Sequence, residues 1–109
     1  MHAPRQYLDP DQRAAAPCLF RALEAARVEH TAAIGRDPSG TVDAQVLIQT
    51  AKDALRTQPL FEVVEYVTIS NADTFAELTS VGSDGAVLSA AVKIGNTRLL
   101  DNVILNKLV

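Results

Sequence analysis

Residues 86–105 read AVLSAAVKIGNTRLLDNVIL, and this stretch decides the fold. Two runs rich in aliphatic residues, 86–94 and 97–105, flank the dipeptide Gly95-Asn96. A dipeptide of this kind between two such runs is typical of a two-residue hairpin turn. We therefore predict two antiparallel strands joined by a tight turn.

The predicted turn also sets the register of the two strands. Side chains alternate between the faces of a strand, so each cross-strand pair belongs to one face of the sheet. One face carries the pairs Ile94/Thr97, Val92/Leu99, Ala90/Asp101 and Leu88/Val103, and the other carries Lys93/Arg98, Ala91/Leu100, Ser89/Asn102 and Val87/Ile104. Helices can cover only one face, and we expect an apolar patch on the other to need a cover. That patch consists of Val87, Ala91, Leu100 and Ile104.

Upstream of the hairpin, the apolar residues recur at helical spacing in two segments. Asp9 and Pro10 are typical of a helix start, and Pro17 predicts either a kink near residues 14–17 or a later start of the helix. Thr41 is the predicted cap of the second helix. The two apolar stripes are Ala15, Cys18, Leu19, Ala22, Leu23 and Ala26, then Ala44, Leu47, Ile48, Ala51 and Leu55.

Residues 61–69 are rich in Val, Tyr, Thr and Ile, which is typical of a strand. Two helices followed by three strands predict an α+β fold, a small three-stranded antiparallel sheet packed with two main helices. With 109 residues the chain has the size of one domain, so residues 1–109 are predicted to share a single core.

Composition excludes several classes of function. The net charge is −3 and basic residues are scattered, so nucleic acid is not an expected partner. No apolar run approaches the roughly 20 residues of a membrane span, and residues 1–7 lack a signal-peptide core. The single cysteine, Cys18, excludes an internal disulfide and fits a reducing compartment. We expect a soluble, cytoplasmic protein.

The predicted register places charged residues in two notable positions. Lys93 beside Arg98 is a like-charge pair, which an anion would relieve, unless both side chains extend into water. Asp101 falls on an otherwise apolar face, where a carboxylate needs a hydrogen bond or a partner. A structural role and a proton-transfer role are both open for Asp101.

His2 and His30 are the only histidines, and with Cys18 they show no metal-ligand spacing. We therefore predict no metal site. His2 has an unperturbed pKa suited to a general base, although it could equally belong to a frayed terminus. Tyr7 could bind a ligand or simply pack on the sheet.

Three segments carry a resemblance to a known family. They are Tyr7-Leu8-Asp9-Pro10 with Gln12-Arg13-Ala14-Ala15, Glu65-Tyr66-Val67 through Asn71-Ala72-Asp73-Thr74, and Ile94 through Asn102. In this order they resemble the C-terminal lid domain of pantothenate synthetase, also called pantoate–β-alanine ligase. The resemblance implies a small antiparallel sheet with helices, closing over an ATP- and pantoate-binding N-terminal domain.

The sequence departs from that family in ways that affect function. It has no HxGH motif and no glycine-rich dinucleotide loop. The resemblance also implies a Met-Ser-Ser-Arg-Asn motif holding the ATP phosphates, but residues 1–5 read MHAPR. Asn71 stands where the family usually has an aspartate. These departures argue against binding of the ATP phosphates by residues 1–5.

Three hypotheses follow. The first is a stand-alone, cofactor-free enzyme that cyclises, isomerises or condenses a small-molecule substrate. Its catalytic residues would be His2 and Asp101, and its ligand-binding residues Arg5, Tyr7, Lys93 and Arg98. The second is a piece of a pantoate–β-alanine ligase that needs an N-terminal partner domain in trans. The third is a non-catalytic module that forms a homodimer through the uncovered sheet face.

Overall fold

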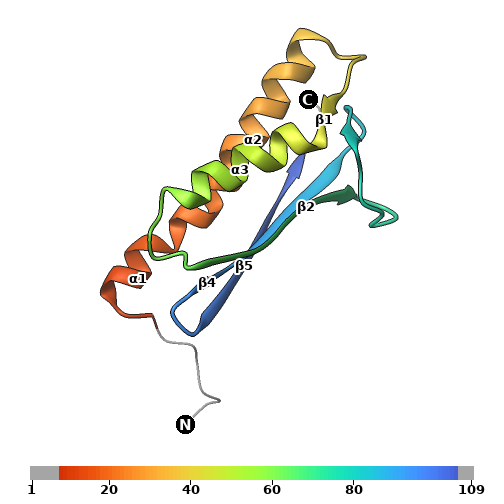
Figure 1. Ribbon diagram of the computed structural model, residues 1–109. Helices are drawn as coiled ribbons and strands as arrows, with labels where there is room; N and C mark the ends of the chain where they lie inside the picture. The colour runs from red at the N-terminus through yellow and green to blue at the C-terminus, as the bar shows by residue number, and fades with distance from the viewer. Residues whose placement is uncertain (1–7, 106–109) are drawn as a thin grey trace.

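The computed structural model describes residues 8–105, and the chain forms the predicted α+β fold. Figure 1 shows two long helices lying side by side along one face of the sheet. The elements in chain order are α1 (Pro10–Ala15), α2 (Pro17–Arg36), β1 (Val42–Asp43), α3 (Ala44–Arg56), β2 (Val63–Asn71), β3 (Ser80–Val81), β4 (Ala86–Ile94) and β5 (Thr97–Leu105).

The first helical segment is interrupted where the proline predicted a kink. α1 ends at Ala15, and α2 begins at Pro17, where the missing N–H of proline costs no hydrogen bond. Asp9 caps α1 by accepting a hydrogen bond from the Gln12 N–H at 2.8 Å, and the Gln12 side chain accepts from the Asp9 N–H. This reciprocal capping box fixes the start of the helical layer.

The predicted cap of α3 is wrong, because Asp43 rather than Thr41 occupies that position. The Asp43 carboxylate accepts a hydrogen bond from the Gln45 N–H at 2.9 Å. The chain stays extended for two residues longer than expected, because Val42 pairs with Val81 in a small sheet of β1 and β3. This pairing joins residues far apart in sequence, so helical spacing gives no sign of it.

The main sheet has the strand order β2-β4-β5, and all its pairs are antiparallel. The register of β4 and β5 is the predicted one along all nine residues, from Ile94 opposite Thr97 to Ala86 opposite Leu105. β2 lies two residues later than predicted, and its register shifts between Val64 and Tyr66. The bulge leaves Glu65 between two paired positions.

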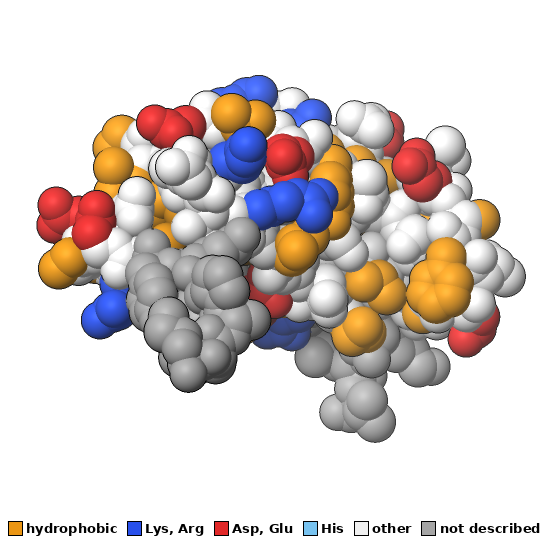
Figure 2. All heavy atoms as spheres, turned by 90° about the horizontal axis from the view of Figure 1, so that it is seen from below, with side chains coloured by type: hydrophobic (Ala, Val, Ile, Leu, Met, Phe, Trp, Pro, Cys, Tyr) orange, Lys and Arg blue, Asp and Glu red, His pale blue; other side chains and the backbone are white. Residues whose placement is uncertain are grey.

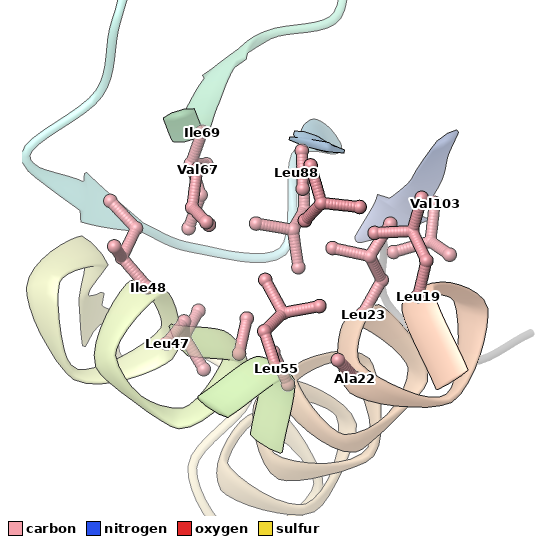
Figure 3. Close-up of a cluster of buried hydrophobic side chains, with 14 of the residues drawn as sticks. Leu19, Ala22, Leu23, Leu47, Ile48, Leu55, Val67, Ile69, Leu88 and Val103 are labelled. Carbon is pink, nitrogen blue, oxygen red and sulfur yellow. The ribbon is translucent and has the colours of Figure 1, made fainter. Parts of the chain in front are cut away.

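The core lies between the helices and one face of this sheet (Figure 3). The inner side chains of β4 are fully buried, and the apolar stripes of α2 and α3 are buried except for Cys18, which is half-buried. Figure 3 shows side chains of α2, α3, β2, β4 and β5 meeting in this layer. The labelled ones are Leu19, Ala22, Leu23, Leu47, Ile48, Leu55, Val67, Ile69, Leu88 and Val103.

The hairpin turn requires glycine at its first position. Gly95 has φ +62°, and a Cβ there would lie 2.7 Å from the Gln12 Nε2. We expect Gly95→Ala to lower the free energy of unfolding by about 1–2 kcal/mol through left-handed backbone strain. Gly35→Ala is the control, since Gly35 lies in α2 with nothing within 4 Å of an added Cβ. Urea unfolding should show the control to be neutral or stabilising. Equal losses of unfolding free energy in the two variants would show that backbone strain at position 95 is not the cause.

Candidate functional site

The sheet face opposite the helices carries both of the predicted ligand-binding side chains that the structure describes. Lys93 and Arg98 face each other across β4 and β5, as the register predicted. Both side chains are exposed. Glu65, delivered by the bulge in β2, forms an ion pair with Arg98.

This ion pair changes the electrostatics of the face. The hydrogen bond from Arg98 to Glu65 raises the pKa of Arg98, and the charge of the carboxylate adds to the effect. The guanidinium also lies 6.0 Å from the centre of the Tyr66 ring, within the range of a cation–π contact. The chain itself therefore supplies a negative charge beside Arg98, as a bound anion would have done. Within the part of the chain that the structure describes, Lys93 has no ion-pair partner.

Asp101 lies on the other side of the sheet from Lys93 and Arg98. It stands opposite Ala90 on the helix-facing side, and its side chain is half-buried. Its carboxylate accepts a hydrogen bond from the backbone N–H of the next residue, Asn102, at 2.8 Å. This contact gives the carboxylate one hydrogen-bond donor, and both roles of Asp101 stay predictions. The structure does not bring Asp101 together with the basic pair.

The apolar patch on the uncovered face is smaller than the sequence predicted. Ala91 is fully buried, because it lies between Tyr66 and Leu100 in the register, and Val87 is half-buried. Leu100 and Ile104 remain 57% and 50% exposed. Within this patch of four residues, the exposed side chains are therefore those of β5.

The remaining predicted site residues, His2, Arg5 and Tyr7, lie outside the described residues. Figure 2 shows apolar side chains interspersed with charged groups of both signs on the surface seen from below. Between residues 8 and 105, no group of three or more His, Cys, Asp and Glu could hold a metal ion. No helix in that range is long and apolar enough to span a membrane.

His30 is a buried polar residue whose role the sequence analysis missed. Its side chain is fully buried in α2, and its Nε2 lies 2.7 Å from the carbonyl oxygen of Gly82. A carbonyl can only accept, so Nε2 carries the proton and donates it. Nδ1 has no hydrogen-bond partner among the described residues. The available signal was the spacing of Ala26, His30 and Ile34, which continues the apolar stripe of α2.

These contacts tie three polar side chains to neighbouring parts of the fold. His30 ties α2 to the loop after β3, Asp101 binds the backbone beside it, and Arg98 binds Glu65. On the sheet face without helices, the Lys93 ammonium and the side chains of Leu100 and Ile104 are exposed. Such a face can bind an anionic group or another polypeptide.

Comparisons with known proteins give a consistent result. Residues 1–104 match the family described as "Pantoate-beta-alanine ligase". The chain is 39% identical to the pantothenate synthetase of Herpetosiphon aurantiacus over 96% of its own length and 35% of that protein. It is 41% identical to the Chloroflexus aggregans pantothenate synthetase over 91% of its length and 33% of that protein. The crystal structure of pantothenate synthetase from Thermus thermophilus superposes with a TM-score of 0.73 and 31% identity, covering 92% of this chain and 33% of that one. The chain thus spans about a third of the length of the curated relatives it matches.

Proposed function

The chain belongs to the pantoate-beta-alanine ligase family, and from that premise we propose that it works as the C-terminal domain of such a ligase. The observation that carries the proposal is the extent of the similarity. More than nine-tenths of the chain aligns with pantothenate synthetases, while only about a third of each relative is matched. On this proposal the ATP and pantoate sites are built mainly by an N-terminal domain, as the family resemblance implies, and this domain closes over them.

This proposal takes precedence over a stand-alone, cofactor-free enzyme. Such an enzyme would need a group that moves a proton beside a group that binds substrate. The described candidates do not converge, since Asp101 lies on the helix-facing side and the basic pair on the other. The departure of residues 1–5, MHAPR, from the family's phosphate-binding motif still favours the stand-alone enzyme. It therefore remains the second candidate.

The proposed function is tested by a chimera in which this chain replaces the C-terminal third of the Herpetosiphon aurantiacus pantothenate synthetase. We expect the chimera to form pantothenate from pantoate and β-alanine, and only with ATP. The same relative truncated before its C-terminal third is the control, and it should form far less. A folded chimera that makes no more product than the truncated control would refute the proposal. Turnover of a metabolite by the chain without ATP would favour the second candidate.

Within the ligase, Lys93 is proposed to attract the anionic groups of the substrates. Its ammonium is exposed and lies beside the Arg98 guanidinium, whose charge the Glu65 carboxylate partly offsets. We expect Lys93→Gln in the chimera to raise the KM for an anionic substrate several-fold, with a smaller change in kcat, because only binding is affected. Lys52→Gln, on α3, is the matched control. Equal KM values for the two variants would show that Lys93 does not contribute to substrate binding.

A further inference from the structure

The bulge in β2 brings an acidic and an aromatic side chain to one place on the sheet face without helices. Glu65 has no partner of its own in the register, and Tyr66, the next residue, stands opposite Ala91 on β4. Both side chains reach Arg98 on β5, Glu65 through an ion pair and Tyr66 with its ring centre 6.0 Å from the guanidinium. Bulges commonly redirect side chains beside functional sites. The bulge here therefore holds one arginine with two neighbouring side chains.

Arg98 is held by the side of its guanidinium, which leaves the end of the group free. Its Nε donates a hydrogen bond to Oε1 of Glu65. Neither terminal nitrogen, Nη1 or Nη2, has a hydrogen-bond acceptor among residues 8–105, and 47% of the side chain is exposed. A guanidinium has five N–H donors in a rigid plane, and its terminal pair matches the two oxygens of a carboxylate. Glu65 therefore orients Arg98 without using the donors that suit a carboxylate best.

The surroundings of Arg98 discriminate among anions. Lys93 pairs with Arg98 on one side and with Val63 on the other, so all three lie on the same face. Lys93 and Arg98 carry two positive charges against one negative charge on Glu65, which leaves a net charge of +1. Val63 is 47% exposed, and Leu100, two residues after Arg98 on the same face, is 57% exposed. The net charge matches one carboxylate, and the aliphatic side chains favour an acid with a short apolar body over a bare phosphate.

We propose that Arg98 and Lys93 form a binding site for a small carboxylate with an aliphatic body, in which Glu65 is a positioning residue. Arg98 binds both carboxylate oxygens through its terminal nitrogens, and Lys93 adds a point charge. Glu65 holds the guanidinium in place before the ligand arrives, which lowers the entropy cost of binding. An amino acid such as β-alanine fits less well, because Lys93 and Arg98 repel its ammonium group. The site belongs to this chain alone, so the inference goes beyond the ligase role proposed for Lys93 and does not depend on it.

NMR titration of the 109-residue chain tests the site directly. The probe is isobutyrate, compared with β-alanine and inorganic phosphate, and sodium chloride keeps the ionic strength constant because salt screens surface charges. We expect isobutyrate to shift the backbone amide signals of residues 93 and 98, and to bind about tenfold more weakly to Arg98→Gln, which loses a charge-assisted pair. Arg56→Gln is the matched control and should bind like the wild type, since Arg56 is an exposed arginine paired with Asp53 on α3. No isobutyrate-dependent shift at residues 93 and 98, equal binding by the two variants, or tighter binding of β-alanine or phosphate would overturn the site.

Two replacements of Glu65 test its positioning role. Glu65→Gln and Glu65→Ala both remove the negative charge, but only glutamine keeps an oxygen that can accept a hydrogen bond from the Arg98 Nε. With the charge equal, we expect Glu65→Ala to bind isobutyrate about threefold more weakly than Glu65→Gln, because its arginine is no longer held in place. The amide spectrum of each variant shows whether it is folded, which separates a general loss of structure from a loss of binding. Equal affinities for the two folded variants would show that Glu65 does not position Arg98.

Discussion

Replacing Leu88 by alanine should lower the free energy of unfolding by about 2–5 kcal/mol, which is the largest single-residue effect that we expect in this chain. Leu88 lies on the central strand β4, its side chain is fully buried, and it projects into the layer between the sheet and both helices (Figure 3). Truncation removes apolar contacts and leaves a cavity that the surrounding helices and strands can only partly close. A small domain has limited stability, so much of the folded population should be lost.

The matched control is Leu100→Ala on the neighbouring strand. Leu100 has the same side chain but is 57% exposed on the face without helices. Its truncation should cost well under half as much, because its side chain already contacts water. Chemical denaturation of both variants, followed by circular dichroism, gives the two values. Similar losses would mean that the helices do not cover the Leu88 face.

Replacing His30 by alanine should cost about 2–4 kcal/mol, the second largest effect. Two losses add, since the fully buried ring leaves a cavity and the Gly82 carbonyl loses its donor. The Nε2–oxygen distance is 2.7 Å, so the hydrogen bond is short and well formed. Val28→Ala, on the same helix and 54% exposed, is the control and should be nearly neutral.

His30→Leu separates the hydrogen bond from the packing. Leucine fills much of the same volume and removes the unpartnered Nδ1, but it cannot donate to Gly82. We expect an intermediate loss, accompanied by faster amide hydrogen exchange around Gly82. A His30→Leu variant as stable as the wild type, with unchanged exchange, would show that the bond to the loop contributes nothing.

The sequence allowed much of the fold to be predicted because its strongest signals are local. Gly95-Asn96 set the register of β4 and β5, and Pro17 set the break between α1 and α2. The pairing of Val42 with Val81 was not predictable in this way, because it joins short segments from distant parts of the chain. That pairing also explains why Asp43, rather than the predicted Thr41, caps α3.

The candidate site could be predicted less completely, for a physical reason. The alternation of side chains placed Lys93 beside Arg98 and Asp101 on the opposite face, and the structure has this arrangement. It could not predict the ion pair with Glu65, which depends on a bulge that shifts the register by one residue. Nor could it predict the bond between His30 and Gly82, which needs the packing of α2 against a loop.

The central claim is that this chain supplies the closing domain of a ligase and none of its nucleotide chemistry. The most direct measurement is release of pyrophosphate when the purified 109-residue chain is incubated with ATP and pantoate. The account predicts no release above the rate without protein, and release once the chain is fused to the ATP-binding part of a relative. Pyrophosphate released by the unaided chain, in proportion to its concentration, would contradict the account.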